Sequence, residues 1–142
     1  LQLRVATVYL DSKYDSYVGS QFGDISGRSV GGIPKWSTTV GATYTADLND
    51  GKALILNADY HNESNTVMND NPADAQYKRE VNDLSAAVTL RFDTGLQFSL
   101  WGRNLTDAQY LSVIFPSVVQ AGSISGYPNA PRTYGASVKY KF

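Results

Sequence analysis

Apolar and polar residues alternate without interruption through the last ten residues of the chain, 133–142. One side of a strand built from this segment is apolar and ends in aromatics: Tyr134, Ala136, Val138, Tyr140 and Phe142. The opposite side carries Lys139 and Lys141. Because successive side chains of a strand point to opposite faces, this pattern predicts one face against hydrocarbon and the other in water. Such a pattern is typical of a transmembrane β-barrel strand.

The same alternation recurs upstream, in five segments that we expect to be strands: 1–9, 37–45, 53–61, 84–92 and 96–103. In segment 53–61, Ala53 and Ile55 are apolar residues on the otherwise polar side. A Lys or Arg that faces lipid at the middle of a bilayer costs about 2–4 kcal/mol, so a membrane strand keeps its charges on the other side. We therefore expect all strand charges on the polar side and predict an all-β, antiparallel transmembrane β-barrel segment of about six strands.

The connections between these segments predict which strand ends lie together. Asn49–Gly51 and Asp93–Gly95 are short, with the Gly that tight hairpin turns need, whereas 11–35, 62–80 and 107–131 are long and polar. Short and long connections alternate, as in bacterial barrels with periplasmic turns and external loops. In that frame the aromatics form two belts, an outer and an inner one. The outer belt is Tyr9, Trp36, Tyr60 and Tyr134, and the inner one is Tyr44, Phe92, Tyr140 and Phe142.

Composition adds a few limits to this picture. A hydrophobic fraction of 42% and a charged fraction of 18% are also those of a soluble domain, and no apolar run reaches the ~18 residues of a membrane helix. The formal net charge of −1 offers no basic patch for nucleic acid, and the absence of cysteine excludes disulfides and thiolate metal sites. Since six strands fall short of the eight of the smallest membrane barrels, and Leu1 already lies in a strand pattern, we expect residues 1–142 to be the carboxy-terminal part of a larger barrel.

Two motifs near the end of the chain carry a family resemblance. The first is Leu100-Trp101-Gly102-Arg103-Asn104-Leu105-Thr106-Asp107-Ala108-Gln109-Tyr110, and the second is Pro131-Arg132-Thr133-Tyr134-Gly135, which leads to Phe142. Together they resemble the end of a TonB-dependent outer-membrane receptor, where an Asn-Leu-Thr-Asp motif precedes a Pro-Arg-Thr-Tyr-Gly motif. Ile33-Pro34-Lys35-Trp36 is similar to that family's Ala-Pro-Lys-Trp entry to an earlier strand. The resemblance spans essentially the whole chain.

The resemblance implies a bacterial outer-membrane barrel of about 22 strands, plugged by an amino-terminal domain that is absent from this sequence. Such receptors import scarce nutrients with energy delivered by TonB through the plug, and we expect a ferric siderophore as the nutrient here. We expect outer-membrane lipid, the ligand and TonB as partners, and no cofactor. Aromatic and cationic groups of the loops and lumen suit an anionic iron chelate by stacking and charge. The candidate ligand-binding residues are Arg28, Tyr77, Arg103, Tyr110 and Tyr127.

Enzymatic and metal-binding functions are not expected. No nucleophile elbow or phosphate loop is present, and His61 is the only histidine, so we expect it to be a polar residue of the lumen. Asn104–Asp107 is expected to turn the chain as it leaves its strand. Two alternatives remain open: a soluble antiparallel sandwich or lipocalin-like binding module with an internal core, and a porin-like passive channel.

Overall fold

The computed structural model describes residues 1–142, and its regular structure is almost entirely β. The strands are β1 (Gln2–Tyr9), β2 (Trp36–Leu48), β3 (Lys52–Val67), β4 (Lys78–Phe92), β5 (Leu96–Arg103), β6 (Leu111–Pro116), β7 (Ile124–Pro128) and β8 (Thr133–Tyr140). A single 3-10 turn, η1 (Pro72–Asp74), lies between β3 and β4. The structure contains no helix that is long and apolar enough to cross a membrane.

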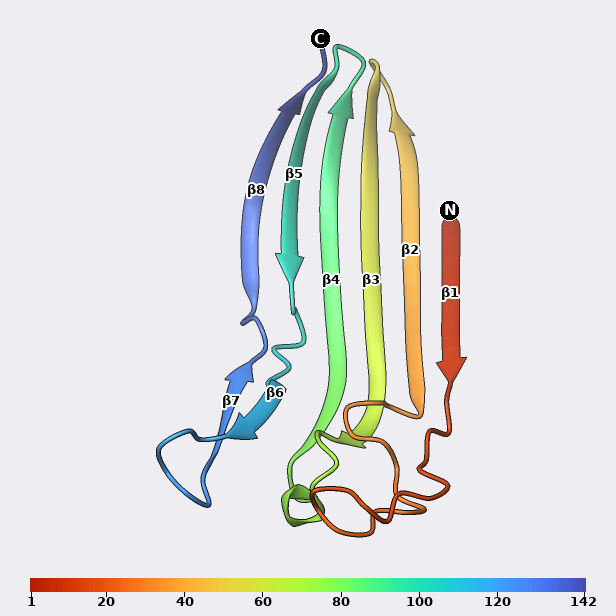
Figure 1. The fold of residues 1–142 in the computed structure, drawn as a ribbon. Helices are drawn as coiled ribbons and strands as arrows, with labels where there is room; N and C mark the ends of the chain where they lie inside the picture. Colours follow the sequence, from red (N-terminus) through yellow and green to blue (C-terminus); the bar gives the residue numbers. More distant parts are fainter.

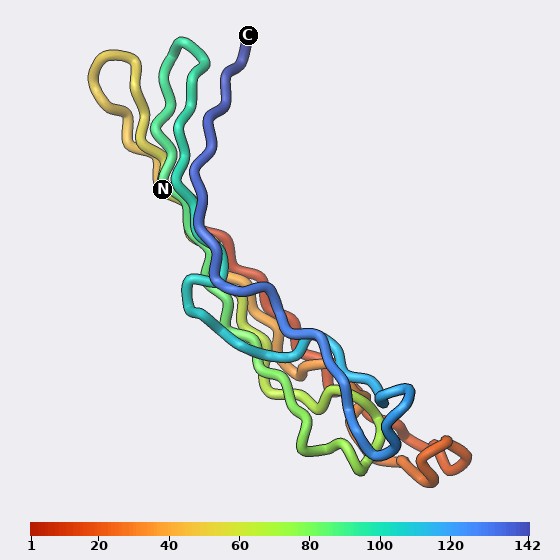
Figure 2. The backbone as a smooth tube through the Cα atoms, turned by 90° about the vertical axis from the view of Figure 1, so that its left-hand side faces the viewer, coloured from red at the N-terminus to blue at the C-terminus, as the bar shows by residue number.

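Six of the strands form one antiparallel sheet in the order β1-β2-β3-β4-β5-β8 (Figure 1). β6 and β7 form a separate hairpin beyond the ends of β5 and β8. Seen nearly edge-on, the large sheet is a single twisted layer (Figure 2). The sheet does not close, because β1 and β8 are its two free edges, and only nine of the 142 residues are buried. The prediction of an all-β antiparallel fold is confirmed.

The two short connections are tight turns, as predicted. Asp50 and Gly51 have φ angles of 63° and 66°, and Gly95 has a φ of 87°. Glycine adopts such left-handed angles without steric cost, which explains its place in both turns. Both turns and the carboxy terminus lie at one end of the sheet, whereas the three long connections gather at the other end (Figure 1). We call these the turn end and the loop end.

The strand register places the alternating residues on two distinct faces. Directly opposed residues of antiparallel strands project to the same side. One such row crosses five strands with apolar residues: Tyr44, Leu56, Val88, Leu100 and Ala136. The adjacent row projects to the other side and is mostly hydroxylated: Thr45, Ile55, Thr89, Ser99 and Ser137. We call the two sides the apolar face and the polar face. The predicted assignment of residues to faces is confirmed by these pairings.

Two strands, β3 and β4, extend into a predicted loop. β3 continues to Val67 and β4 begins at Lys78, so the connection is far shorter than the expected 62–80. The added part of β3 is polar, which is typical of a loop, and its register shifts at an irregularity between Glu63 and Thr66. An extra residue in one strand breaks the alternation on which the prediction depended.

The expected loop 107–131 contains regular structure as well. β6 and β7 pair within it, with Ile114 opposite Gly126. The prolines and glycines of this segment hid the hairpin, because they are typical of loops. At the carboxy terminus, β8 ends at Tyr140, two residues before the predicted strand does.

Within the predicted segments the strand charges lie on the polar face, as expected, but the strands extend beyond those segments and carry charges on the apolar face at their ends. Lys52 pairs with Phe92 and therefore lies on the apolar face at the turn end. Glu80 lies on the same face at the loop end, where the Asn82 side chain donates to its carboxylate over 3.3 Å. Between these ends, the apolar-face residues of β4 from Leu84 to Phe92 include no charge. The charges thus lie outside the apolar rows rather than within them.

Aromatic residues lie on the apolar face at both ends, in two oblique lines. At the loop end, Tyr9 and Trp36 have ring centroids 4.7 Å apart. Tyr134 lies in the row that passes through Ala42, six residues along β2 from Trp36. The aromatic line at the loop end therefore crosses the sheet obliquely.

The aromatic line at the turn end also crosses the sheet obliquely. Tyr140 lies opposite Leu96, in the row that continues through Phe92 to Leu48 on β2. Tyr44 is four residues along β2 from Leu48, in the same direction as Trp36 from Ala42. The two aromatic lines are consequently offset in the same sense across the strands.

Candidate functional site

The polar face carries a cross-strand ion pair between β1 and β3. Arg4 Nη2 lies 2.8 Å from Asp59 Oδ1, with side chains 61% and 50% exposed. Gly41 on β2 lies between the two partners in register, and a Cβ there would be 2.6 Å from Asp59 Oδ1 and 2.9 Å from Arg4 Nη2. The absence of a side chain at Gly41 therefore makes room for this ion pair.

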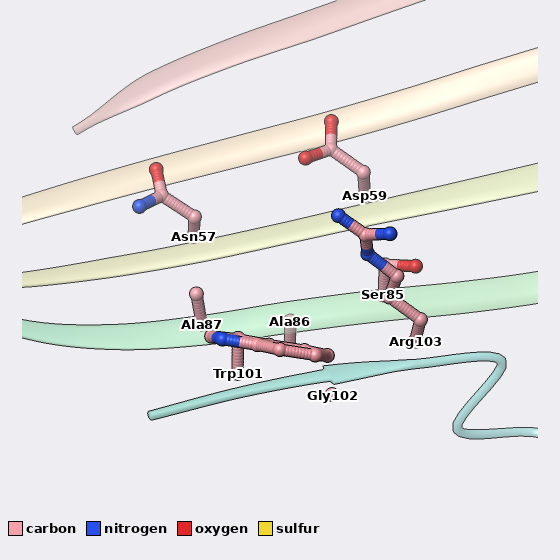
Figure 3. Close-up of a pocket in the computed structure, with 8 residues that line it drawn as sticks. All are labelled: Asn57, Asp59, Ser85, Ala86, Ala87, Trp101, Gly102 and Arg103. Atoms are coloured by element: carbon pink, nitrogen blue, oxygen red, sulfur yellow. The ribbon is translucent and has the colours of Figure 1, made fainter. Parts of the chain in front are cut away.

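Next to this pair, Trp101 and Arg103 border a shallow hollow of about 220 Å³ on the polar face (Figure 3). The Arg103 guanidinium carbon lies 5.3 Å from the centroid of the Trp101 ring, within the range of a cation–π contact. Asn57, Asp59 and Ser85 line the hollow from β3 and β4. Arg103 has no carboxylate partner within 4 Å, so its charge is free to meet a ligand or another part of the protein.

A second polar group connects β2, β3 and β4 to the hairpin at the loop end. His61 contacts Thr39 Oγ1 through Nδ1 over 3.0 Å and Glu63 Oε1 through Nε2 over 3.3 Å. The other oxygen of Glu63 accepts from Arg79 Nη2 over 2.7 Å, and both of these side chains are about one-fifth exposed. Arg79 Nη1 also donates to the Ser112 carbonyl over 3.4 Å. This chain of hydrogen bonds, which we call the relay, connects β6 to the sheet.

Tyr110 lies beside this relay. Burial raises the pKa of its phenol, and the negative charge of Asp83 raises it further, against the opposing effect of Arg79. The phenol is therefore a neutral hydrogen-bonding group at physiological pH. Tyr110 is thus a predicted ligand-binding residue that lies close to several charged groups, Asp83, Arg79 and Glu63.

The connection 11–35 is fixed to the connection after β3 through Asp70. Its carboxylate accepts from the Gly31 backbone N–H over 2.7 Å and from the Tyr14 hydroxyl over 3.0 Å. The hydrogen bond to Asp70 raises the pKa of the Tyr14 phenol, because the bond favours the protonated form. Gly31 lies so close to the Asn69 backbone that a Cβ at this position has no space. These two loops form one packed unit.

Asn104 organises the chain where it leaves β5. It is 3% exposed and has a φ of 48°. Its amide nitrogen donates to the carbonyls of Ala108 and Ala130 over 3.0 and 3.1 Å, and its amide oxygen accepts from the Ala108 N–H over 2.9 Å. Asn104 thus joins the outgoing and returning arms of the hairpin connection. This agrees with the turning role that the sequence predicts for Asn104–Asp107.

A cleft of about 580 Å³ lies at the base of the β6–β7 hairpin. Apolar groups of both arms line it, among them Tyr110, Leu111, Pro128 and Pro131. Its polar lining includes Gln109 and Asp107, and the Asp107 carboxylate lies 3.3 Å from Arg132. The volume is within the range of ordinary ligand pockets.

The five predicted ligand-binding residues do not converge on one site. Arg28 is an exposed side chain of the first loop, and Tyr77 follows η1, where its N–H donates to the Asp74 carbonyl. Arg103 lies on the polar face over Trp101, and Tyr110 lines the hairpin cleft. Tyr127, which is 63% exposed, packs on Phe115 with ring centroids 5.4 Å apart.

Sequence reasoning missed the Glu63–Arg79 pair and the hairpin cleft. The pair straddles the irregularity in β3, so alternation gave no signal that the two residues meet. The cleft depends on a hairpin that the sequence did not reveal. No group of three or more His, Cys, Asp or Glu side chains is arranged to hold a metal ion.

The chain matches no family model, and it matches neither a curated protein nor a solved structure.

Proposed function

We propose that this chain is a wall segment of a TonB-dependent outer-membrane receptor that takes up a scarce nutrient, a ferric siderophore in the first instance. In this account the apolar face contacts lipid, the polar face lines the lumen, and the loop end faces outward. The segment transports rather than catalyses. TonB acts through a plug domain outside this sequence.

The observation that carries the proposal is the continuous apolar face of an unclosed sheet. Large apolar side chains on it are open to solvent, including Leu100 at 67%, Val138 at 66% and Val88 at 46%. Soluble proteins rarely expose a contiguous apolar surface of this kind. The β6–β7 hairpin lies beyond the sheet and does not cover this face (Figure 1). A soluble sandwich or lipocalin-like module would need a covering layer of protein here.

The dimensions of the apolar face also support a membrane role. The apolar-face residues of β4 lie in a segment of nine residues, from Leu84 to Phe92. A tilted membrane strand uses about 9–11 residues to cross the bilayer. Strands tilted by 35–45° and spaced about 4.8 Å apart shift a horizontal line by about four to six residues over four strands. The two aromatic lines shift by four and six residues between β2 and β8.

Cell fractionation and uptake test the proposal together. The protein is expected in the outer-membrane fraction, and cells that carry its gene are expected to accumulate radiolabelled ferric siderophore. Inactivation of TonB is expected to abolish this uptake. Uptake that persists without TonB would instead favour a passive channel, and recovery of the protein in the aqueous fraction would contradict the proposal.

A further inference from the structure

The loop end is poorly suited to an anionic ligand, because acidic side chains outnumber basic ones there. Segments 10–35, 62–83 and 103–132 contain nine Asp or Glu and seven Lys or Arg. A net negative surface repels anions over distances of about a Debye length, near 8 Å at physiological salt.

Most of the basic side chains at the loop end are also paired. Asp11 lies 3.0 Å from Lys13 and 3.5 Å from Lys35. Arg79 is paired with Glu63, and Arg132 with Asp107. The basic residues left without a carboxylate partner are Arg28, Lys78 and Arg103, which belong to three different connections or strands. Arg103 and Lys78 line different hollows, so these two residues do not share an anion site.

The hairpin differs from the rest of the chain because it lacks charge altogether. The 24 residues from Ala108 to Pro131 include no Asp, Glu, Lys, Arg or His, although 25 of 142 residues in the chain are acidic or basic. The hairpin nevertheless exposes apolar groups, with Val113 at 47% and Tyr127 at 63%. Moving an ion from water onto an uncharged surface costs more free energy than moving an uncharged partner there.

The cleft at the hairpin base adds a specific shape to this surface, and its one charged lining residue, Asp107, is paired with Arg132. Tyr110, Leu111, Pro128 and Pro131 provide apolar walls. The side chain of Gln109 makes no hydrogen bond within the protein, so its amide is available to a ligand. By contrast, Asn129 is already engaged, because its amide donates to the Ala108 and Ala130 carbonyls and accepts from the Tyr110 N–H.

We propose that this cleft binds an uncharged ligand, or the uncharged portion of one, that combines an apolar ring or chain with amide or hydroxyl groups. Tyr110 packs against the apolar part, and Gln109 hydrogen-bonds the polar part. The inference rests on the proposed function, since it names the class of nutrient that the outward end would select. It differs from the expectation of an anionic chelate, because acidic side chains outnumber basic ones at the loop end.

Two iron complexes, one uncharged and one anionic, test this inference. The full chain in detergent micelles is dialysed to equilibrium against radiolabelled iron(III) trishydroxamate, which is uncharged, or iron(III) triscatecholate, which is anionic. We expect the uncharged complex to bind at least about tenfold more tightly, a difference of about 1.4 kcal/mol. Equal or tighter binding of the anionic complex, or no binding of either, would overturn the proposal.

Variants locate the bound complex. Tyr110→Ala is expected to weaken binding of the uncharged complex at least about tenfold, and Gln109→Ala about threefold. Gln109 is exposed and has no intramolecular partner, so its replacement leaves the fold intact. Val119→Ala is the control, because Val119 is 97% exposed on the same hairpin and does not line the cleft. Binding that Gln109→Ala and Tyr110→Ala both leave unchanged would place the ligand elsewhere and overturn the proposal.

Two experiments distinguish a failure of this inference from a failure of the proposed function. Outer-membrane fractionation tests the membrane role without any ligand, whereas dialysis in micelles tests the cleft without any transport. A protein that reaches the outer membrane but binds only the anionic complex would contradict the cleft alone.

Discussion

Gly135 lies directly opposite Trp101 in the register of β5 and β8, and its missing side chain leaves the space that the Trp101 indole occupies. A Cβ at position 135 would come within 2.7 Å of Trp101 Cε2 and closer still to the neighbouring ring carbon. The indole can therefore lie along the polar face, where Arg103 contacts its ring. A glycine in one strand thus determines how an aromatic side chain of the next strand is presented.

Gly135→Ala is expected to displace the Trp101 ring and to lower the free energy of unfolding by about 1–3 kcal/mol, the usual cost of overpacking. Urea unfolding in detergent micelles, followed by tryptophan fluorescence, measures this change. Gly19→Ala is the matched control, because nothing lies within 4 Å of a Cβ at Gly19. Equal stability of the two variants would show that the indole has room to move.

Lysine substitutions at two consecutive residues of β4 test the two faces. Val88 lies on the apolar face and Thr89 on the polar face. Val88→Lys is expected to reduce insertion into lipid vesicles by about 2–4 kcal/mol, because its ammonium would face the middle of the bilayer. Thr89→Lys is expected to cost about 1 kcal/mol, from the lost 2.7 Å hydrogen bond to Ser99. Similar losses in a vesicle partition assay would argue against a lipid-facing side.

Asn104→Ala is expected to loosen the hairpin connection. The variant removes these three hydrogen bonds and leaves the Ala108 N–H without its partner, whereas the Ala108 and Ala130 carbonyls still accept from the Asn129 amide. Each unsatisfied buried group costs about 1–3 kcal/mol. Hydrogen exchange is expected to accelerate in residues 105–131 and to stay unchanged in β2 and β3. Asn104→Gly, which relieves the positive φ but removes the same bonds, is expected to behave in the same way.

The ion pairs of Asp11 predict an acid-sensitive closure of the first loop. The hydrogen bond from Lys13 is the main cause of the lowered pKa of Asp11, and the charges of Lys13 and Lys35 contribute. Because the folded-state pKa lies below the ordinary value of 3.8, the stabilisation is present above about pH 4 and is lost as the pH falls through the folded-state pKa.

Hydrogen exchange at the Leu10 amide, which donates to the Lys35 carbonyl over 2.9 Å, reports this closure. Protection is expected to fall below about pH 4 after correction for the intrinsic exchange rate. In Asp11→Asn, protection is expected to be lower at neutral pH and to lose this acid dependence. An unchanged acid dependence in the variant would assign the effect to another group.

Alternation predicted the faces of the sheet because a strand side chain has only two directions to choose from. The row of Leu56, Val88 and Leu100 follows from spacing within each segment and from the tight turns that set the register. The same reasoning failed beyond Asn62, since the β3 irregularity near Glu63 changes the count and the residues there are polar on both sides.

The candidate site was less accessible to sequence reasoning than the sheet. Asn104 was correctly predicted to turn the chain. Its short polar side chain favours a left-handed backbone conformation, and this preference depends only on the local sequence. The contact between Arg79 and Glu63 joins residues whose register the irregularity alters. The cleft at Tyr110 depends on the pairing of Leu111 with Pro128, which no local pattern reveals.

The two faces of the sheet are expected to meet different solvents, and the two tryptophans of the chain report on them separately. Trp36 lies on the apolar face and Trp101 on the polar face. Single-tryptophan variants, Trp101→Phe and Trp36→Phe, are reconstituted in vesicles with brominated lipid or with aqueous iodide. We predict that brominated lipid quenches Trp36 and that iodide quenches Trp101. Protection of Trp36 from brominated lipid, with quenching of Trp36 by iodide, would contradict the account.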